Sequence, residues 1–477
     1  MSNLKHRAIT GTLWSATQKF SVSIISFLSN IVLARLLTPA DYGCIGMLSI
    51  FIAISNSLIY GGFISALIQA KETSDKDYNT VFYWNLIVSL ILYLMLFFFA
   101  PFIADYYRIQ QLCQVLRVQG IILIINGFSA IQLSILRRNL DFNRLAIFNI
   151  IASVAAAIVA ISLAIYGLGV WALVLQQIVL SLVNCILLWT RTSWRPSLSF
   201  SIDSFRRLFS YGGFLLINEI INTLCDNIQG LLIGRRFSPS IMGYYSQAKK
   251  LEEVPTQSIS QVVTQVTFPI YSKIQDDKSR LYRGVKETLS LMNFLNFPLM
   301  ALLFVIAKPL FIFLYSDKWI EAVPLFQILC VAGLVNCLQS VNYQVVSAVG
   351  RSKDLFYWNF FKRGLGLFFM IIGLSFGVKG LLWGMVIGSY ITFFVNAFLA
   401  NKSTGYSLWE QIVDSSLTLT ISFISATITF LISFIHLQNF ILLICQLTVF
   451  FLCYLLLAYI FKRQELNELL AICKIKK

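Results

Sequence analysis

The stretch LARLLTPADYG, residues 33–43, has a counterpart 200 positions later in IGRRFSPSIMG, residues 233–243. Each copy ends an apolar run with a small residue and an arginine. Each then places a hydroxyl residue before a proline and a glycine four residues after that proline. Serine and threonine are favoured N-caps, and proline is favoured at the first helical position. Each copy therefore predicts a short turn between two helices.

The correspondence continues on both sides of these copies, which indicates an internal duplication. Lys19 corresponds to Glu219 at the same offset, and Gly167 corresponds to Gly377 at an offset of 210. Two halves of about 200 residues with one short insertion explain both offsets. We therefore predict three parts, which are residues 1–199, 200–402 and 403–477.

The composition is that of a polytopic membrane protein. Of the 477 residues, 58% are hydrophobic and 12% are charged, and the mean hydropathy is +0.77. A soluble domain carries about 25% charged residues, so a soluble globule is excluded. A helix needs about 20 apolar residues to cross a bilayer. Such runs predict an all-α fold with 14 transmembrane helices, at 12–33, 42–68, 81–103, 116–136, 145–166, 169–189, 210–233, 241–270, 289–314, 322–349, 355–376, 380–400, 412–435 and 440–461.

Two features set the predicted topology. Six spans per half is an even number, so both halves enter from the same side. This predicts two parallel six-helix bundles around a central cavity, followed by two extra C-terminal helices. Lys and Arg gather on the side of the N-terminus, which places both termini in the cytoplasm. Lys362 and Arg363, in the first turns of the eleventh span, are counted on that side. Anionic headgroups, not nucleic acid, then explain the net charge of +16.

The opening span of each half carries a polar face. Lys19 shares a helix face with serine and asparagine residues in the first span, and Glu219, Asn222 and Asp226 share one in the seventh. An ionisable residue within a span costs ~2.5–3.5 kcal/mol on insertion scales, so it persists where it meets water, a partner or a function. We predict that both faces line the cavity and carry opposite charges.

The eighth and tenth spans hold further polar residues. A helix this polar is unstable against lipid, so it is expected to border a wet cavity. The residues predict a hydrophilic lumen suited to hydrogen bonding with carbohydrate, and they are Gln247, Lys250, Gln257, Gln261, Asn336 and Gln339.

Simpler explanations of several charges stay open at this point. The charged residues within 249–253 have the spacing of a salt-bridged turn at the membrane surface. Arg35 and Arg235 lie at the ends of spans, where arginine side chains act as interfacial anchors that snorkel to the headgroups.

Four motifs together carry a family resemblance. They are LARLLTPADYG (33–43), GYYSQAKKL (243–251), TFPIYSKIQ (267–275) and Asp317-Lys318-Trp319. The chain resembles the polysaccharide-exporter branch of the multidrug, oligosaccharidyl-lipid and polysaccharide exporter superfamily. It is most similar to exporters of repeat units of the colanic-acid or teichuronic-acid type, over residues 8–400.

The resemblance implies a flippase in the bacterial cytoplasmic (inner) membrane. Such a protein moves an undecaprenyl-pyrophosphate-linked oligosaccharide from the inner to the outer leaflet by alternating access to a V-shaped cavity. Cationic cavity residues are implied to hold the pyrophosphate, and Lys19, Arg35 and Lys250 are the candidates here. Membrane lipid is an expected partner, and a polysaccharide polymerase and a chain-length regulator are candidate protein partners.

The expected site combines these cations with the polar lumen. Glu219 and Asp226 are candidate coupling residues that would bind H⁺ or Na⁺, or balance the cations. The candidate substrate-binding residues are Lys19, Arg35, Asn222, Arg235, Gln247, Lys250, Gln257, Gln261, Asn336 and Gln339.

Two other functions are compatible with a polytopic chain. A cation-coupled multidrug exporter would need an acidic, aromatic cavity, whereas the predicted lumen is mixed in charge and rich in amides. A membrane polysaccharide polymerase or ligase would carry a long outer loop with acid-base residues, and no such loop is predicted. Because His6 lies in the tail and His436 in a hairpin, we also expect no enzyme activity, no resident cofactor and no metal site.

Overall fold

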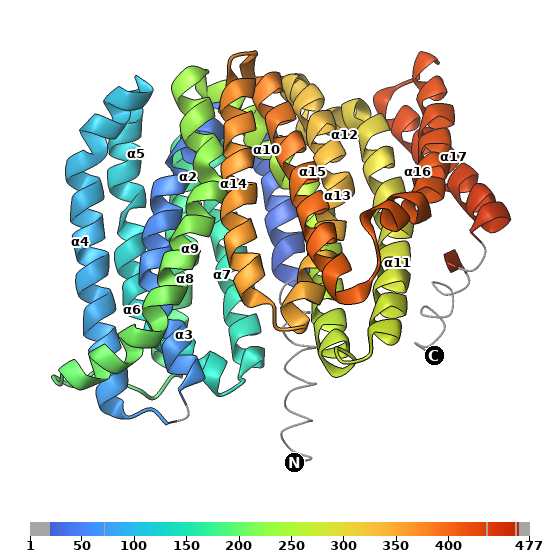
Figure 1. The fold of residues 1–477 in the computed structure, drawn as a ribbon. Helices are drawn as coiled ribbons and strands as arrows, with labels where there is room; N and C mark the ends of the chain where they lie inside the picture. Colours follow the sequence, from blue (N-terminus) through green and yellow to red (C-terminus); the bar gives the residue numbers. More distant parts are fainter. Residues whose placement is uncertain (1–19, 71, 436, 463–464, 467–477) are drawn as a thin grey trace. The chain divides into compact units, whose positions relative to one another are not determined.

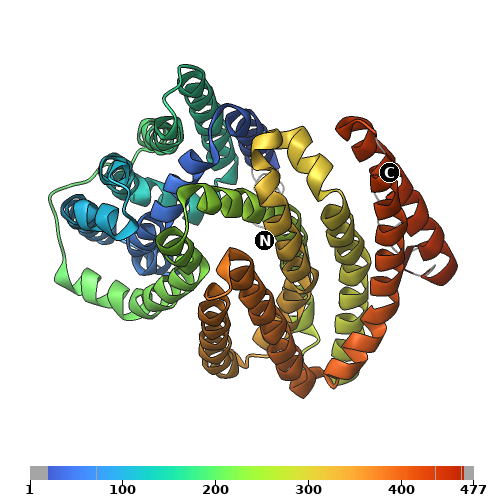
Figure 2. The ribbon, with the colours of Figure 1, turned by 90° about the horizontal axis from the view of Figure 1, so that it is seen from above.

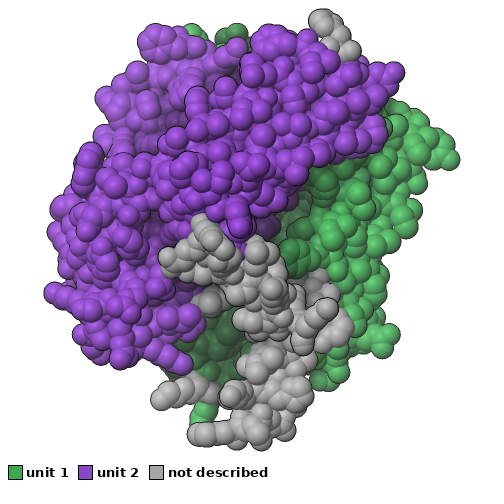
Figure 3. Space-filling model, turned by 90° about the vertical axis from the view of Figure 1, so that its right-hand side faces the viewer, with its two compact units in different colours: residues 1–243 green, residues 244–477 purple. Residues whose placement is uncertain are grey.

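The computed structural model describes residues 20–70, 72–435, 437–462 and 465–466, and the regular elements within these ranges are all helices (Figure 1). The all-α prediction is confirmed for this part of the chain. The chain divides into two compact units, residues 1–243 and residues 244–477, which Figure 3 colours separately. This division follows packing, and the three parts predicted from the sequence stay a prediction.

The helices of the first unit begin with Phe20–Leu36. The others are α2 (Pro39–Tyr60), α3 (Gly62–Gln69), α4 (Asp75–Tyr107), α5 (Gln111–Gln119), α6 (Ile121–Arg138), α7 (Phe142–Ile165), α8 (Val170–Arg191) and α9 (Ile202–Arg236). The next helix, α10 (Pro239–Lys273), starts in the first unit and continues through the second. The remaining helices are α11 (Lys278–Val305), α12 (Ala307–Tyr315), η1 (Asp317–Ala322), α13 (Val323–Ala348), α14 (Ser352–Leu374), α15 (Gly377–Thr404), α16 (Leu408–Leu431), η2 (Ile432–Phe434) and α17 (Asn439–Phe461).

Ten of these helical stretches are long and apolar enough to cross a membrane. Among the longer described helices, α9, α10 and α14 do not meet that measure because charged and amide residues interrupt their apolar sequence, whereas Phe20–Leu36 and α12 are too short. The protein is therefore a multi-pass membrane protein. The count of 14 spans, the two six-helix bundles and the cavity between them stay predictions.

Hydroxyl residues start several helices, including the one that the sequence predicted after Thr38. Thr38 accepts a hydrogen bond from the backbone N–H of Asp41 (3.3 Å), and the Asp41 carboxylate accepts one from the N–H of Thr38 (2.9 Å). The same capping box begins α4 at Ser74 and α16 at Ser407. The helix start predicted within residues 33–43 is thus confirmed.

Three predicted spans are interrupted in the structure. The predicted span 42–68 divides into α2 and α3 at Gly61, and the span 289–314 divides into α11 and α12 at Ile306. The predicted span 116–136 divides into α5 and α6 at Gly120. Pro309 explains the break at Ile306, because proline has no N–H to donate to the carbonyl of Val305, where α11 ends. The helices are not continuous at these positions, although Pro39–Gln69 and Gln111–Arg138 are each long and apolar enough to cross a membrane.

Within the first unit, the two copies of the repeated stretch lie against each other. A Cβ atom on Gly43 would meet the carbonyl oxygen of Pro239 at 1.8 Å, and a Cβ on Gly243 would meet the carbonyl oxygen of Pro39 at 1.8 Å. Each helix start therefore crosses the other with backbone against backbone, and only glycine fits at the crossing. This reciprocal contact gives a physical reason for the glycine that follows proline in both copies.

The second unit is built around α13. This helix packs against α11 and α15, α15 pairs with α14, and α16 packs against α11 (Figures 1 and 2). Side chains tie the last helices to the others: Asn342 and Gln411 exchange two hydrogen bonds (3.0 and 3.3 Å), and Asn293 donates to the Ser415 hydroxyl (2.7 Å). The pair α16–α17 is thus joined to α11 and α13 by polar contacts as well as by apolar packing.

Candidate functional site

The second unit contains a polar pocket of about 350 Å³ between α10, α13 and α15. Its lining offers carboxylates, amides, hydroxyls and an ammonium group. The lining residues are Lys249, Glu252, Glu253, Thr256, Gln257, Ser260, Leu329, Ala332, Asn336, Gln339, Ser340, Met385 and Ser389. We call this the polar pocket.

Helix α10 supplies one wall of the polar pocket because of the spacing of its polar residues. Between positions 249 and 260 the lining residues recur at three- and four-residue intervals, which places them along one side of a helix. Pro255 lies inside this stretch and leaves one carbonyl of the preceding turn without its usual donor. Beside it, the Thr256 hydroxyl donates to the carbonyl oxygen of Glu252 (2.9 Å).

The two adjacent carboxylates of α10 have different surroundings. Glu253 pairs with Lys249, at 3.8 Å between Nζ and Oε1, and its side chain is 39% exposed. Glu252 is only 5% exposed and accepts one long hydrogen bond (3.5 Å) from Nδ2 of Asn336. Gly333 on α13 makes room for it, since a Cβ there would meet Oε1 of Glu252 at 2.7 Å. The salt bridge that the spacing of residues 249–253 suggested is thus present between Lys249 and Glu253. The Glu252 carboxylate instead accepts a hydrogen bond from the amide of Asn336.

The amides of α13 form the opposite wall. Gln339 donates from Nε2 to the carbonyl oxygen of Ser389 (2.8 Å) and to Oδ1 of Asn336 (3.4 Å). Asn296 on α11 donates to the carbonyl oxygens of Gly333 and Leu334 (both 2.9 Å), which holds this turn of α13 in place. Carboxylates accept hydrogen bonds and amides do both. The polar pocket can therefore bind a ligand rich in hydroxyl groups.

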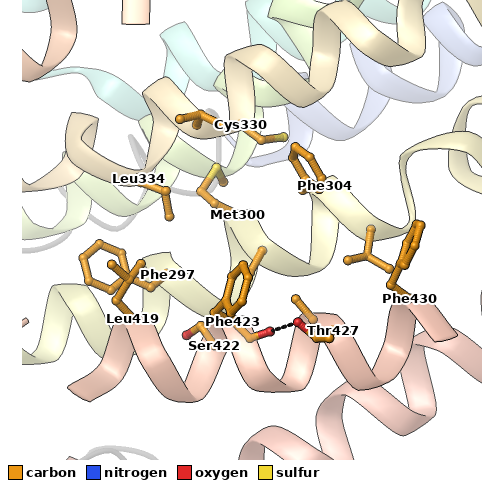
Figure 4. A pocket seen from close by; sticks show the side chains of 14 residues that line it. Phe297, Met300, Phe304, Cys330, Leu334, Leu419, Ser422, Phe423, Thr427 and Phe430 are labelled. Atoms are coloured by element: carbon orange, nitrogen blue, oxygen red, sulfur yellow. Dashed lines mark hydrogen bonds between the residues drawn. The ribbon is translucent and has the colours of Figure 1, made fainter. Parts of the chain in front are cut away.

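A second pocket in the same unit has the opposite chemistry. It has a volume of about 420 Å³ and is lined by α11, α13 and α16, almost wholly with apolar side chains. Figure 4 shows Met300 and Phe304 of α11 on the side facing Phe423 of α16. The hydroxyl of Thr427 donates within its own helix, to the carbonyl oxygen of Phe423 (2.9 Å). We call this the apolar pocket.

The structure brings together three of the residues predicted to bind substrate. Gln257, Asn336 and Gln339 all line the polar pocket. Gln247, on the same helix, is 1% exposed and is not among its lining residues, and neither is the exposed Lys250. Of the polar residues predicted on this helix, Gln257 thus lines the polar pocket, whereas Gln247 and Lys250 do not. Lys19 and the side chain of Gln261 lie outside the described residues.

The other predicted residues lie in the first unit. Arg35, Glu219 and Asp226 are exposed, and Asn222 is half-buried. The guanidinium of Arg235 donates to the carbonyl oxygen of Tyr106 (2.5 Å) and lies over the ring of the same tyrosine, 4.9 Å from its centre. These contacts fit the alternative in which Arg235 anchors the end of α9.

Comparison with known proteins identifies the family. The family model described as "Polysaccharide biosynthesis protein" matches residues 32–324, well over half of the chain. The chain belongs to the polysaccharide biosynthesis protein family. The matched range contains all four motifs on which the resemblance was based, so that prediction is confirmed.

The relatives of this polysaccharide biosynthesis protein include proteins named for polymer synthesis and transport. It is 25% identical to the lipopolysaccharide biosynthesis protein WzxC of Escherichia coli over 436 residues, 88% of each chain. It is also 25% identical to the teichuronic acid biosynthesis protein TuaB of Bacillus subtilis, over 75% of each chain. The succinoglycan biosynthesis transport protein ExoT of Rhizobium meliloti is 25% identical over 72% of this chain and 70% of its own.

Solved structures of other proteins share the fold of this family member. The lipid II flippase MurJ in an inward closed conformation matches with a TM-score of 0.79 at 17% identity, over 95% of this chain and 99% of its own. An inward-facing multidrug resistance transporter of the MATE family matches with a TM-score of 0.63 at 17% identity, over 80% of this chain and 94% of its own. At these identities the likeness concerns the fold alone.

Sequence reasoning missed two ionisable groups of this polysaccharide biosynthesis protein. Glu252 was considered only as part of a charged turn, although it is the buried carboxylate of the polar pocket. Lys362 was counted on the cytoplasmic side, in the first turns of the eleventh span, and its burial was not predicted: α14 begins at Ser352, and Lys362 is 4% exposed within it. The available signal was the cost of an ionisable residue within a span, because Lys362 already lay inside the predicted span 355–376.

Proposed function

We propose that this chain is a flippase for a lipid-linked polysaccharide repeat unit. Its substrate would be an undecaprenyl-pyrophosphate-linked oligosaccharide, moved from the inner to the outer leaflet of the bacterial cytoplasmic membrane by alternating access. Membership of the polysaccharide biosynthesis protein family, in a chain whose relatives include a succinoglycan transport protein, is the observation that carries this proposal. Both termini would lie in the cytoplasm.

The chemistry of the polar pocket supports a glycan as part of the substrate. A sugar offers hydroxyl groups that both donate and accept hydrogen bonds, and it loses hydration when it enters a membrane protein. Glu252, Gln257 and Asn336 provide acceptors and donors that can replace that water. The mixed charge of this lining also favours a glycan over the organic cations that a multidrug exporter would carry.

The apolar pocket supports a lipid-linked substrate. An isoprenoid chain is apolar throughout, so it needs a surface without unsatisfied polar groups. Helix α13 lines both pockets, and α11 lines the apolar pocket. Met300 of α11 lies in the apolar pocket, and its sulfur is 2.6 Å from the Cβ position of Gly333, which is beside Glu252. An amphiphilic molecule matches this close pairing of polar and apolar surfaces.

The membrane potential would favour export of a pyrophosphate. A headgroup with about two negative charges that leaves a cell about 100 mV negative inside gains ~4.6 kcal/mol, at ~2.3 kcal/mol per charge. Lys19, Arg35 and Lys250 are the cations proposed to balance those charges during passage. On this proposal the chain performs transport rather than a catalysed reaction, with the polymerase and chain-length regulator acting on the exported product.

The test is deletion of the gene in its host followed by replacement. We expect the deletion strain to lose its surface polysaccharide and to accumulate a lipid-linked glycan facing the cytoplasm, and the intact gene to reverse both changes. A strain with normal polysaccharide but increased sensitivity to organic cations would contradict this function and favour the multidrug alternative.

A further inference from the structure

Glu252 has the surroundings of a carboxyl group that can hold a proton. It is 95% buried, its carboxylate accepts the long hydrogen bond from Asn336, and it forms no ion pair within the described chain. The lysine one turn away, Lys249, lies 3.8 Å from the neighbouring Glu253. A buried carboxylate without a counter-ion is costly, and protonation removes that cost.

Lys362 is the matching buried cation of the second unit. Its ammonium group is on α14 and donates to Oδ1 of Asn396 on α15 at 2.7 Å, and it forms no ion pair among the described residues. A neutral amide oxygen cannot balance a positive charge within a membrane protein. Such a lysine is expected to have a distant counter-charge or a functional role.

A chain of amide groups connects these two residues. Asn396 accepts from Lys362 and donates from Nδ2 to the backbone oxygen of Gln339 (3.3 Å). Gln339 in turn donates to Oδ1 of Asn336 (3.4 Å), and Asn336 donates to Oε1 of Glu252 (3.5 Å). Every donor along this chain points from the lysine toward the glutamate. Aligned amide dipoles of this kind favour a positive charge at one end and a negative charge at the other.

The polar pocket gives the glutamate end of this chain access to water. Glu252 lines that pocket, whereas Lys362 does not. A proton from water can therefore reach the Glu252 end of the chain through the polar pocket.

We propose that Glu252 is the proton-binding residue that couples this transporter, and that Lys362 sets its ionisation through Asn396, Gln339 and Asn336. This inference rests on the proposed transport function. It assigns coupling to the second unit, in place of the pair Glu219 and Asp226 named from the sequence. Uptake of one proton by the Glu252 carboxylate would break the charge balance along the amide chain, which gives the two protonation states different internal energies.

Few other ionisable groups lie around Glu252. The neighbours contributed by α11 (Met300) and α15 (Met385 and Ser389) do not titrate. The ionisable neighbours belong to α10 and α13, and they are Tyr245, Lys249, Glu253, Cys330 and Cys337.

The direct test is infrared spectroscopy of the purified, full-length protein during a pH change. We expect a carboxyl stretching band from a buried group that is absent in E252Q and present in E219Q/D226N. K362M should shift the pH midpoint of that band, and K362R should restore it. The exposed residues Glu287 and Lys353 supply the matched controls E287Q and K353M. A band that persists in E252Q, or a midpoint unaffected by K362M, would overturn the proposal.

A second variant tests the same carboxyl group without removing it. G333A keeps every ionisable group but places a Cβ at 2.7 Å from Oε1 of Glu252, so it should alter the same band without removing it. An unchanged band in G333A would contradict the seat described for this carboxyl.

The cellular readout is surface polysaccharide in the deletion strain. E252Q should lower it about fivefold or more relative to the wild-type gene, whereas E219Q/D226N should not. The opposite result would return coupling to Glu219 and Asp226. If the wild-type gene itself restores no polysaccharide, the proposed function fails, while the infrared bands still decide whether Glu252 and Lys362 are linked.

Discussion

Helices α2 and α10 begin at the two copies of one repeated stretch, yet they differ in almost every later position. At the 200-residue offset, Glu252 corresponds to Ile52, an apolar residue that is 7% exposed. Lys249, which pairs with Glu253, corresponds to Ser49, whose hydroxyl donates within its own helix to the carbonyl oxygen of Gly46 (2.8 Å). The shared start positions both helices, and the residues that follow make one a packing helix and the other a pocket wall.

This comparison separates two kinds of constraint. The Pro–Gly crossing depends on backbone contact, so it demands the same residues in both copies. The polar pocket depends on side-chain chemistry, which only α10 carries. Variants of the two copies should therefore behave alike at the crossing and differently one or two turns further on.

The largest loss of stability is expected at the crossing itself. G43L and G243L each place atoms where a proline carbonyl lies, at 1.8 Å from the Cβ position. We expect each to cost about 3 kcal/mol or more, with little monodisperse protein recovered in size-exclusion chromatography. The control is G364L, because nothing lies within 4 Å of that Cβ position. Normal recovery of G43L with loss of G243L would show that the two copies are not equivalent.

The next largest effect is expected when α2 receives the charge of α10. I52E puts a carboxylate at a buried apolar position without the space that Gly333 gives Glu252. An ionisable residue in such a place costs ~2.5–3.5 kcal/mol, which should appear as a lower apparent melting temperature in detergent. I52V, which removes only a methylene group, should cost about 1 kcal/mol. An I52E protein as stable as I52V would contradict the contrast drawn between the two helices.

A smaller effect is expected from the caps. Thr38 takes part in a full capping box with Asp41, whereas Ser238 accepts a single hydrogen bond of 3.4 Å from the N–H of Ile241. T38A should therefore cost about 1 kcal/mol and S238A about 0.5 kcal/mol, measured as apparent melting temperatures of the purified proteins. T38S, which keeps the hydroxyl, serves as the control. Equal losses of stability in T38A and S238A would mean that the hydrogen bond accepted by the Asp41 carboxylate adds nothing to the stability of the cap.

The smallest change in stability is expected from the reverse exchange, E252I, which gives α10 the residue of α2. Replacing a buried charge by an apolar group is often neutral for stability, so we expect a change below about 1 kcal/mol. Surface polysaccharide in the deletion strain should nevertheless fall, because the proposed proton-binding group is gone. E287I, at an exposed position of α11, is the control. Full polysaccharide production by E252I would remove Glu252 from the transport mechanism.

The sequence predicted the features that depend on local patterns. Hydrophobic run lengths predicted helices, and a hydroxyl residue before proline predicted the start of α2 correctly, because these effects act within a few residues. The breaks at Gly61 and Ile306 were not predicted, since apolar composition alone does not distinguish a continuous helix from two short ones.

The candidate site was predicted in part for a related reason. Gln257, Asn336 and Gln339 were named from the sequence because amides within apolar helices are costly and therefore visible in a sequence. They line one pocket, and their role in substrate binding stays a prediction. The roles of Glu252 and Lys362 depend on which helices meet, through Gly333 in one case and Asn396 in the other. Contacts between helices far apart in the chain leave no periodic signal, so a single sequence does not reveal them.

The ties between α16 and its neighbours have a consequence for how far the chain can be shortened. A protein ending before Leu408 would lose the partners of Asn293 and Asn342, which are 2% and 0% exposed in the intact structure. Both amides would then face acyl chains without a hydrogen-bond partner, at a cost of several kcal/mol each. The last two helices, although they follow the duplicated part of the chain, are therefore required to keep the interior of the second unit away from lipid.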